Sequence, residues 1–188
     1  MVGIQVVDNF LSDDDFYGVV NYCKTSLYHY GEVDDYSSVP SGENIDKYVT
    51  GMVHQIFPPL QNESNSSKKI LSLIHDKCVS QFPVLKQFDL QRMYINCFAP
   101  GENPRFHVDT PEDISKLYTC LYYTNNYWDL CEGGETQFYV DKSIYGVPPV
   151  PNRMILFDGS ILHKATSFKT YHRFSIALKY CKNDKHSK

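Results

Sequence analysis

The chain has 188 residues, of which 42% are hydrophobic, and this length suits one compact domain. Its 18 basic and 22 acidic residues leave a net charge of −4, without the basic patch that nucleic-acid binders usually carry. No apolar run is long enough to cross a membrane, so we expect neither a nucleic acid nor a membrane as a partner.

The cysteines indicate a reducing environment. They are scattered along the chain and include no CxxC pair, and the sequence shows no N-terminal signal peptide. Free thiols are the rule in proteins that remain inside the cell. We therefore expect a cytoplasmic protein with reduced cysteines at positions 23, 78, 97, 120, 131 and 181.

The chain opens with a short apolar strand at 4–7 and a helix predicted from about residue 13 to about 28. Ser12 is a typical N-cap, and the acidic residues 13–15 suit the positive end of the helix dipole. A cation site is the alternative interpretation of these three aspartates, but the start of a helix explains them more fully.

A polar loop and a second helix follow. Residues 31–50 are rich in Gly, Ser and Asp, which predicts a loop. A helix is predicted from about residue 66 to 81, because one face of it would collect Ile70, Leu73, Ile74 and Cys78.

From residue 88 onward the sequence is typical of a β-rich domain. Short apolar and aromatic runs alternate with turn signals such as Pro100-Gly101 and Gly133-Gly134. This texture favours a sandwich or barrel, with the two helices bracing one face of a jelly roll. The predicted strands span 88–98, 105–109, 116–124, 135–141, 152–158 and 173–181.

His107 and Asp109, in the run RFHVDT, are the first candidate metal ligands. On an extended strand, residues i and i+2 point to the same side, so one imidazole and one carboxylate would project together. A His-x-Asp pair also occurs by chance, and two polar residues on an ordinary loop are the alternative.

His163 supplies a candidate third ligand. It follows the predicted strand at 152–158 and the turn at Asp158-Gly159, and jelly-roll topology can bring it opposite His107. Two histidines and one carboxylate on one face of an ion form a facial triad with open positions, as in non-haem Fe(II) oxygenases. The alternative for His163 is a histidine that packs in the core.

Arg173 lies ten residues beyond His163, on one face of the last strand together with Ser175, Ala177 and Lys179. An inward guanidinium costs free energy unless it meets an anion, and its planar fork suits a carboxylate. Ser175 would add a hydroxyl donor. An outward-facing arginine on an edge strand is the alternative.

Together, HVD at 107–109, His163 and RFS at 173–175 resemble the pattern of 2-oxoglutarate- and Fe(II)-dependent oxygenases, nearest to the prolyl 4-hydroxylase-like branch. The context is also similar, with Gly101 six residues before His107, EGGETQFY at 132–139 and RMILFDG at 153–159. The resemblance covers about residues 88–181.

The resemblance implies an α+β, mainly β fold: a double-stranded β-helix (jelly roll, cupin-like) core with N-terminal supporting helices. We expect a single oxygenase domain over 1–188, with a helical support region at 1–87 and a catalytic core at 88–181. The family hydroxylates its substrates and releases succinate and CO2. Family halogenases replace the carboxylate ligand, so the presence of Asp109 favours hydroxylation.

The same resemblance assigns the cofactors. Fe(II) would be held by His107, Asp109 and His163, and 2-oxoglutarate would chelate the iron and pair its far carboxylate with Arg173. Ser175 and Tyr94 would contact that carboxylate, and the alternative for Tyr94, one of fifteen tyrosines, is packing in the core. O2 is the second co-substrate, and ascorbate is a further candidate cofactor.

The substrate is the least determined part. Prolyl hydroxylases carry a tryptophan six residues beyond the basic 2-oxoglutarate residue, where this chain has Lys179. We take Tyr122, Trp128 and Lys179 as candidate substrate-binding residues, and 31–50 and 122–131 as candidate entrance segments. In EGGETQFY we expect a scaffold hairpin, with Thr136 and Phe138 as candidate wall residues.

The sequence is compatible with three functions. One is a prolyl or other peptide hydroxylase, and the second is a hydroxylase of a free amino acid or other small metabolite. The third is a jelly-roll binding module that keeps the residues without turnover. The complete triad with Arg173 argues against the third, because a site that has lost its activity usually loses a ligand.

Overall fold

The computed structural model describes residues 3–32, 42–44, 49–59, 64–110 and 115–182. Two short 3₁₀ helices, at Pro83–Gln87 and Leu130–Glu132, accompany the main elements. In chain order these are β1 (Ile4–Val7), α1 (Asp13–Thr25), β2 (His29–Glu32), β3 (Thr50–Phe57), α2 (Asn65–Gln81), β4 (Asp89–Phe98), β5 (Leu117–Tyr123), β6 (Thr136–Val140), β7 (Ser143–Val147), β8 (Met154–Asp158), β9 (His163–Ala165) and β10 (Arg173–Cys181).

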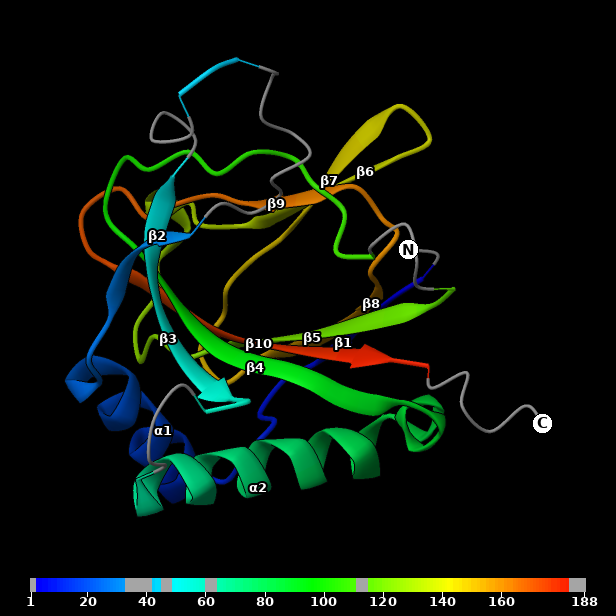
Figure 1. The fold of residues 1–188 in the computed structure, drawn as a ribbon. Coiled ribbons are helices and arrows are strands. Elements are labelled where there is room, and N and C mark those ends of the chain that lie inside the picture. The colour runs from blue at the N-terminus through cyan, green and yellow to red at the C-terminus, as the bar shows by residue number, and fades with distance from the viewer. Residues whose placement is uncertain (1–2, 33–41, 45–48, 60–63, 111–114, 183–188) are drawn as a thin grey trace.

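The strands form two antiparallel sheets. The major sheet has the order β1-β8-β5-β10-β4-β3-β2, and the minor sheet has the order β7-β6-β9. The major sheet lies between the minor sheet and the two helices, which both pack on its far face (Figure 1). The mainly β jelly-roll core with supporting helices is therefore confirmed.

The strands of the major sheet have two different faces. On β10, the side chains of Ile176, Leu178 and Tyr180 join the apolar core beneath α1 and α2. The alternate residues face the minor sheet and include Arg173 and Ser175. Because side chains alternate along a strand, one β10 sequence builds both the core and the wall of a cavity.

The first helix begins at its predicted cap, Ser12, and the second begins one residue before the predicted start, after the cap Ser64. The Ser12 hydroxyl accepts from the backbone N–H of Asp15, and the Ser64 hydroxyl accepts from that of Ser67. The first helix ends at residue 25 instead of 28, because the backbone of Ser26 is extended and its hydroxyl donates to the Tyr22 carbonyl. The helix-start interpretation of residues 13–15 is confirmed.

The prediction of a strand at 105–109 is wrong. This segment forms only an isolated bridge, in which His107 pairs with His163. The strands β2, β3, β7 and β9 were not predicted. Three of them have weak side-chain patterns, because β2 and β7 lie at sheet edges and β9 has only three residues.

The N-terminal region is less helical than expected, because β1, β2 and β3 extend the major sheet on both sides. Residues 33–41 and 45–48 of the predicted loop lie outside the described residues. The ends of that loop belong to β2 and β3. No helix in the described ranges is long and apolar enough to span a membrane.

All six cysteines have free thiols, and five of them are buried. Burial raises the pKa of Cys23 and that of Cys97 to about 12. These thiols therefore remain protonated at neutral pH, as expected of packing residues rather than of nucleophiles.

Candidate functional site

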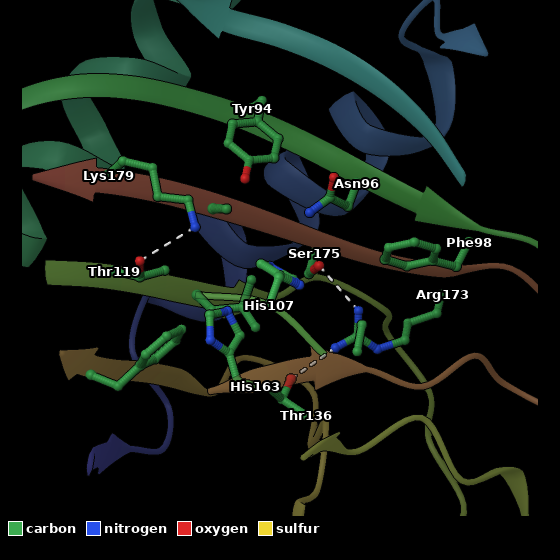
Figure 2. Close-up of a pocket in the computed structure, with 14 residues that line it drawn as sticks. Tyr94, Asn96, Phe98, His107, Thr119, Thr136, His163, Arg173, Ser175 and Lys179 are labelled. Carbon is green, nitrogen blue, oxygen red and sulfur yellow. Dashed lines mark hydrogen bonds between the residues drawn. The ribbon is translucent and has the colours of Figure 1, made fainter. Parts of the chain in front are cut away.

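A cavity lies between the two sheets, on the face of the major sheet away from the helices (Figure 2). The space between its walls is about 450 Å³, including the part open to solvent. Its walls come from β4, β5, β8 and β10 of the major sheet and β6 and β9 of the minor sheet. The lining residues are Tyr94, Asn96, Phe98, His107, Thr119, Leu121, Thr136, Phe157, His163, Ala165, Arg173, Ser175, Ala177 and Lys179.

The two histidines are paired through their backbones. Each backbone N–H donates to the other residue's carbonyl at 2.9 Å, and the imidazole ring centroids lie 4.5 Å apart. His107 Nδ1 lies 3.0 Å from the Arg105 carbonyl, and His163 Nδ1 lies 2.7 Å from the Ile161 carbonyl. A carbonyl can only accept, so Nδ1 carries the hydrogen and Nε2 is left as a ligand atom in both rings.

Asp109 is fixed beside this pair by the turn after β8. Its backbone N–H donates to the Gly159 carbonyl at 2.7 Å. Gly159 approaches so closely that a Cβ there would meet Leu117 at 2.5 Å and the Cβ of Asp109 at 3.2 Å. A glycine is needed at 159 because a larger residue would displace the segment that carries the carboxylate.

The Asp109 carboxylate is surrounded by hydrogen-bond donors. The Thr119 hydroxyl donates to Oδ2 at 2.6 Å, and the Lys179 ammonium contacts the same oxygen. Burial alone would raise the pKa of Asp109, but Lys179, His163 and His107 hold it well below its usual range. The carboxylate is therefore ionised, as a metal ligand must be.

His107, Asp109 and His163 fit a divalent metal ion. Their ligand atoms all lie within 4.8 Å of one another. Asp109 Oδ1 is 3.5 Å from His107 Nε2, and Oδ2 is 3.4 Å from His163 Nε2. Adjacent ligands of an octahedral ion with bonds of about 2.1 Å lie about 3.0 Å apart, so only small movements are needed. The predicted candidate ligands are thus brought together, although residues 107 and 109 do not form a strand.

Arg173 lies at the other end of the cavity and is fully buried. It donates to the Gly134 carbonyl at 2.9 Å, to Thr136 Oγ1 at 3.1 Å and to Ser175 Oγ at 3.2 Å (Figure 2). Within the part of the chain that the structure describes, it forms no ion pair with a carboxylate. Burial lowers the pKa of Arg173, but arginine remains charged. The side chain faces inward as predicted, and its charge has only neutral hydrogen-bond partners.

Lys179 stands at the end of the cavity opposite Arg173, with its ammonium directed at the metal-ligand set (Figure 2). Its Nζ lies 3.3 Å from Thr119 Oγ1 and contacts Asp109. Burial alone would lower the pKa of Lys179, but Asp109 and Tyr94 raise it above its ordinary value. The residue lines the cavity, as a substrate-binding candidate must.

The cavity also contains residues that the sequence argument did not identify. Asn96 and Thr119 project into it from β4 and β5. The strand register places Asn96 opposite Ser175, and Thr119 opposite Lys179, on neighbouring strands. Alternation from Tyr94 along β4 could have identified Asn96, since the two residues are i and i+2.

Two predicted substrate-binding residues do not line the cavity. Tyr122 is fully buried on the opposite face of the major sheet, where its hydroxyl donates to Asn152 Oδ1 and its ring packs against Phe10. The prediction for Tyr122 is wrong, because the side chains of β5 alternate between the two faces of the sheet and Tyr122 lies on the face that packs against the helices. Trp128 is held at the surface by a hydrogen bond from Nε1 to the Gly133 carbonyl, away from the lining residues.

The run EGGETQFY does form part of a hairpin, β6–β7. Thr136 and Phe138 point inward from β6, and Thr136 lines the cavity as predicted. Phe138 packs against His163, with ring centroids 5.9 Å apart, and so supports a candidate ligand from behind.

Comparison with known proteins agrees with this geometry. A family model described as the 2OG-Fe(II) oxygenase superfamily matches residues 93–180, which include both histidines, Asp109 and Arg173. Over these residues the chain resembles the 2OG-Fe(II) oxygenase superfamily. A search of curated proteins found no significant match to this chain.

Solved structures share the fold of this chain at low sequence identity. A Pseudomonas putida prolyl 4-hydroxylase has a TM-score of 0.67 and 17% identity, over 96% of this chain and 92% of that one. A Burkholderia pseudomallei 2OG-Fe(II) oxygenase family protein has a TM-score of 0.73 and 14% identity, over 97% and 87%. A Trichoplax adhaerens prolyl hydroxylase, in complex with a hypoxia inducible factor peptide fragment, has a TM-score of 0.70 and 19% identity, over 96% and 84%.

The match to the 2OG-Fe(II) oxygenase superfamily indicates a dioxygenase that uses Fe(II), 2-oxoglutarate and O2. The cavity fits these requirements, with three metal-ligand side chains at its centre and a buried cation at one end. His107, Asp109 and His163 are the candidate iron ligands.

Proposed function

We propose that the protein is a hydroxylase that converts R–H, O2 and 2-oxoglutarate into R–OH, succinate and CO2. The observation that carries this proposal is that His107 and His163, grouped with Asp109, and the buried Arg173 line one cavity. When bound, Fe(II) and 2-oxoglutarate supply the activation of O2. Ascorbate remains a candidate auxiliary reductant.

In this proposal the metal-ligand residues hold the ion in a fixed geometry. The carbonyls of Arg105 and Ile161 keep both Nδ1 atoms protonated, so that both Nε2 atoms present lone pairs. Thr119 and Lys179 hold Asp109 Oδ2, which leaves Oδ1 free to turn to the ion. These three side chains would hold the ion from one side, beside the cavity that would admit the co-substrate.

Arg173 is proposed to hold the far carboxylate of 2-oxoglutarate. Its guanidinium is oriented by Gly134, Thr136 and Ser175 before any ligand arrives, which limits the entropy lost on binding. Because the surroundings exclude water, its ion pair with a carboxylate is stronger than it would be at the surface. Ser175 and Tyr94 line the same cavity and are proposed to contact the co-substrate.

The class of substrate is a further proposal. A peptide substrate is supported by the fold shared with prolyl hydroxylases, one of which was solved with a peptide fragment. A small-molecule substrate is supported by Lys179, since a charged side chain stands beside the candidate metal site where an apolar proline ring would need apolar contacts. In either case we propose a reducing, cytoplasmic environment, which the free thiols support.

The decisive test measures ligand binding and turnover separately. Fe(II) and 2-oxoglutarate should bind under anaerobic conditions, and O2 should then release succinate slowly even without a substrate. A His107→Ala variant should lose Fe(II) binding and succinate formation, whereas His29→Ala, at an exposed position on β2, should retain both. Wild-type protein that binds neither Fe(II) nor 2-oxoglutarate would refute the proposal.

A further inference from the structure

Lys179 gives the cavity a second cation, which the co-substrate does not use. Arg173 and Lys179 lie on the same face of β10 and are six residues apart, so their backbones are separated by roughly 20 Å. The metal-ligand histidines lie between the two side chains (Figure 2). A 2-oxoglutarate molecule that pairs with Arg173 and reaches the metal therefore stops short of Lys179.

The two cations of the loaded cavity are compensated unequally. Fe(II) and the 2-oxoglutarate dianion cancel, and Glu135 acts on Arg173 through space at one end. At the other end Lys179 contacts Asp109, which must also serve the metal ion. Lys179 is therefore the less compensated cation once the metal is bound.

The neighbours of Lys179 compensate its charge only in part when the metal is bound. Its contacts are the hydroxyls of Thr119 and Tyr94, which are neutral, and Asp109, which must also serve the metal. Asp109 then shares its charge between the metal ion and Lys179, so a further anion beside the ammonium is favoured.

We propose that Lys179 binds a carboxylate of the substrate, so that the enzyme hydroxylates an organic acid at a carbon near that group. This inference rests on the proposed function and narrows its substrate class. The carboxylate belongs either to a free amino or organic acid or to an acidic residue or C-terminus of a peptide. An ammonium has no face on which a proline ring packs, so an unmodified neutral prolyl peptide is disfavoured.

A binding experiment with simple probes tests the charge requirement. Protein is loaded with Mn(II) and 2-oxoglutarate, both affinities are measured first, and proton relaxation of acetate or acetamide near Mn(II) then reports probe binding. Lys179→Met should weaken acetate binding about ten-fold or more, because a charged hydrogen bond is lost, and should leave acetamide unchanged. Lys179→Arg should restore acetate binding, and Lys86→Met, at an exposed position, should match the wild type.

Two results would overturn the inference. One is wild-type protein that binds Mn(II) and 2-oxoglutarate but shows no preference for acetate over acetamide. The other is acetate binding that is the same in Lys179→Met as in the wild type, since the metal alone would then hold the anion. Failure of Mn(II) or 2-oxoglutarate to bind the wild type would instead refute the proposed function.

A substrate screen tests the same inference with turnover and separates the two sources of the carboxylate. The enzyme with Fe(II), 2-oxoglutarate and O2 is given free acids, acidic peptides and the corresponding amides, and mass spectrometry detects addition of one oxygen atom. Either acid set should be oxidised at least about ten-fold faster than its amides. Equal oxidation of acids and amides would contradict the inference.

Discussion

The two ends of the cavity hold their cations in different ways. Arg173 donates to three neutral oxygens and forms no ion pair among the described residues. Lys179 already contacts the carboxylate of Asp109. The two residues lie on the same face of β10, but they differ in what their charges meet. The charge of Arg173 is available to a ligand, whereas the charge of Lys179 is shared with a metal-ligand residue.

The side-chain types suit these two environments. A guanidinium has a planar fork with several donors, so it can be oriented by protein oxygens and still present N–H groups to a carboxylate. An ammonium is a compact point charge on a flexible stem. We infer that the Arg173 end selects one co-substrate by geometry, whereas the Lys179 end selects its ligands by charge.

The largest expected effect comes from removing the metal-ligand carboxylate at the Lys179 end. Asp109→Ala should lower the affinity for Fe(II) more than about 100-fold, because a ligand is lost and Lys179 is left as an uncompensated cation. Anaerobic titration with Fe(II) measures the change, with Asp14→Ala on the exposed start of α1 as the control. Unchanged Fe(II) affinity would show that these residues are not the iron site.

The second largest effect is expected at the Arg173 end and distinguishes the two ends of the cavity. Arg173→Gln should weaken 2-oxoglutarate binding about 100-fold, or roughly 3 kcal/mol, because the buried ion pair is lost, and should change Fe(II) affinity little. Calorimetric titration of each ligand checks both values. A parallel loss of both affinities, with a lower melting temperature, would mean that Arg173 serves the fold instead.

A smaller loss of Fe(II) affinity is expected when the contact between Thr119 and Asp109 is removed. Thr119→Val keeps the side-chain shape but removes the hydroxyl that donates to Oδ2 at 2.6 Å. Outer partners of a metal ligand contribute about 10-fold to 100-fold in affinity, and Lys179 remains, so we expect about a 10-fold loss for Fe(II). An equal loss for 2-oxoglutarate, measured in the same titrations, would remove the distinction between the two ends.

At the Arg173 end, Ser175→Ala should have a modest effect. The Ser175 hydroxyl accepts from Arg173 Nη1 at 3.2 Å, and one such bond contributes about 1 kcal/mol. We expect 2-oxoglutarate binding to weaken about five-fold with no change for Fe(II). A larger effect on Fe(II) than on 2-oxoglutarate would contradict the division of the cavity.

The smallest effect on either ligand is expected from the opposite face of the sheet. Tyr122→Phe removes the hydrogen bond to Asn152 at 2.7 Å and should cost about 1 kcal/mol of unfolding free energy. Binding of Fe(II) and 2-oxoglutarate should match the wild type. Denaturant unfolding and the same titrations check both values, and a selective loss of ligand binding would mean that Tyr122 reaches the cavity.

Much of the site was accessible from the sequence because it depends on short-range spacing. Arg173, Ser175 and Lys179 share a face since strand side chains alternate, and the structure shows this face lining the cavity. His107 and Asp109 converge as predicted, although the reason is different. The first is placed by its bridge with His163, and the second by the turn at Gly159.

The errors arose where the local pattern does not define the surroundings. Tyr122 is aromatic and polar at its tip, which suits either a ligand wall or a buried hydrogen bond. Its neighbour Tyr123 faces the minor sheet, so a shift of one residue separates the two faces. No feature of the sequence around residue 122 determines which of the two tyrosines faces the helices.

The sequence by itself determined the helix starts, the alternation along β10 and the candidate iron ligands, because these follow from the chemistry and spacing of nearby residues. Only the tertiary structure decided which face of each strand meets the helices and that Lys179 contacts Asp109, seventy residues earlier in the chain. It also placed Gly159 against the segment that carries Asp109. These contacts depend on strand pairing, which joins distant segments in a register that no local pattern specifies.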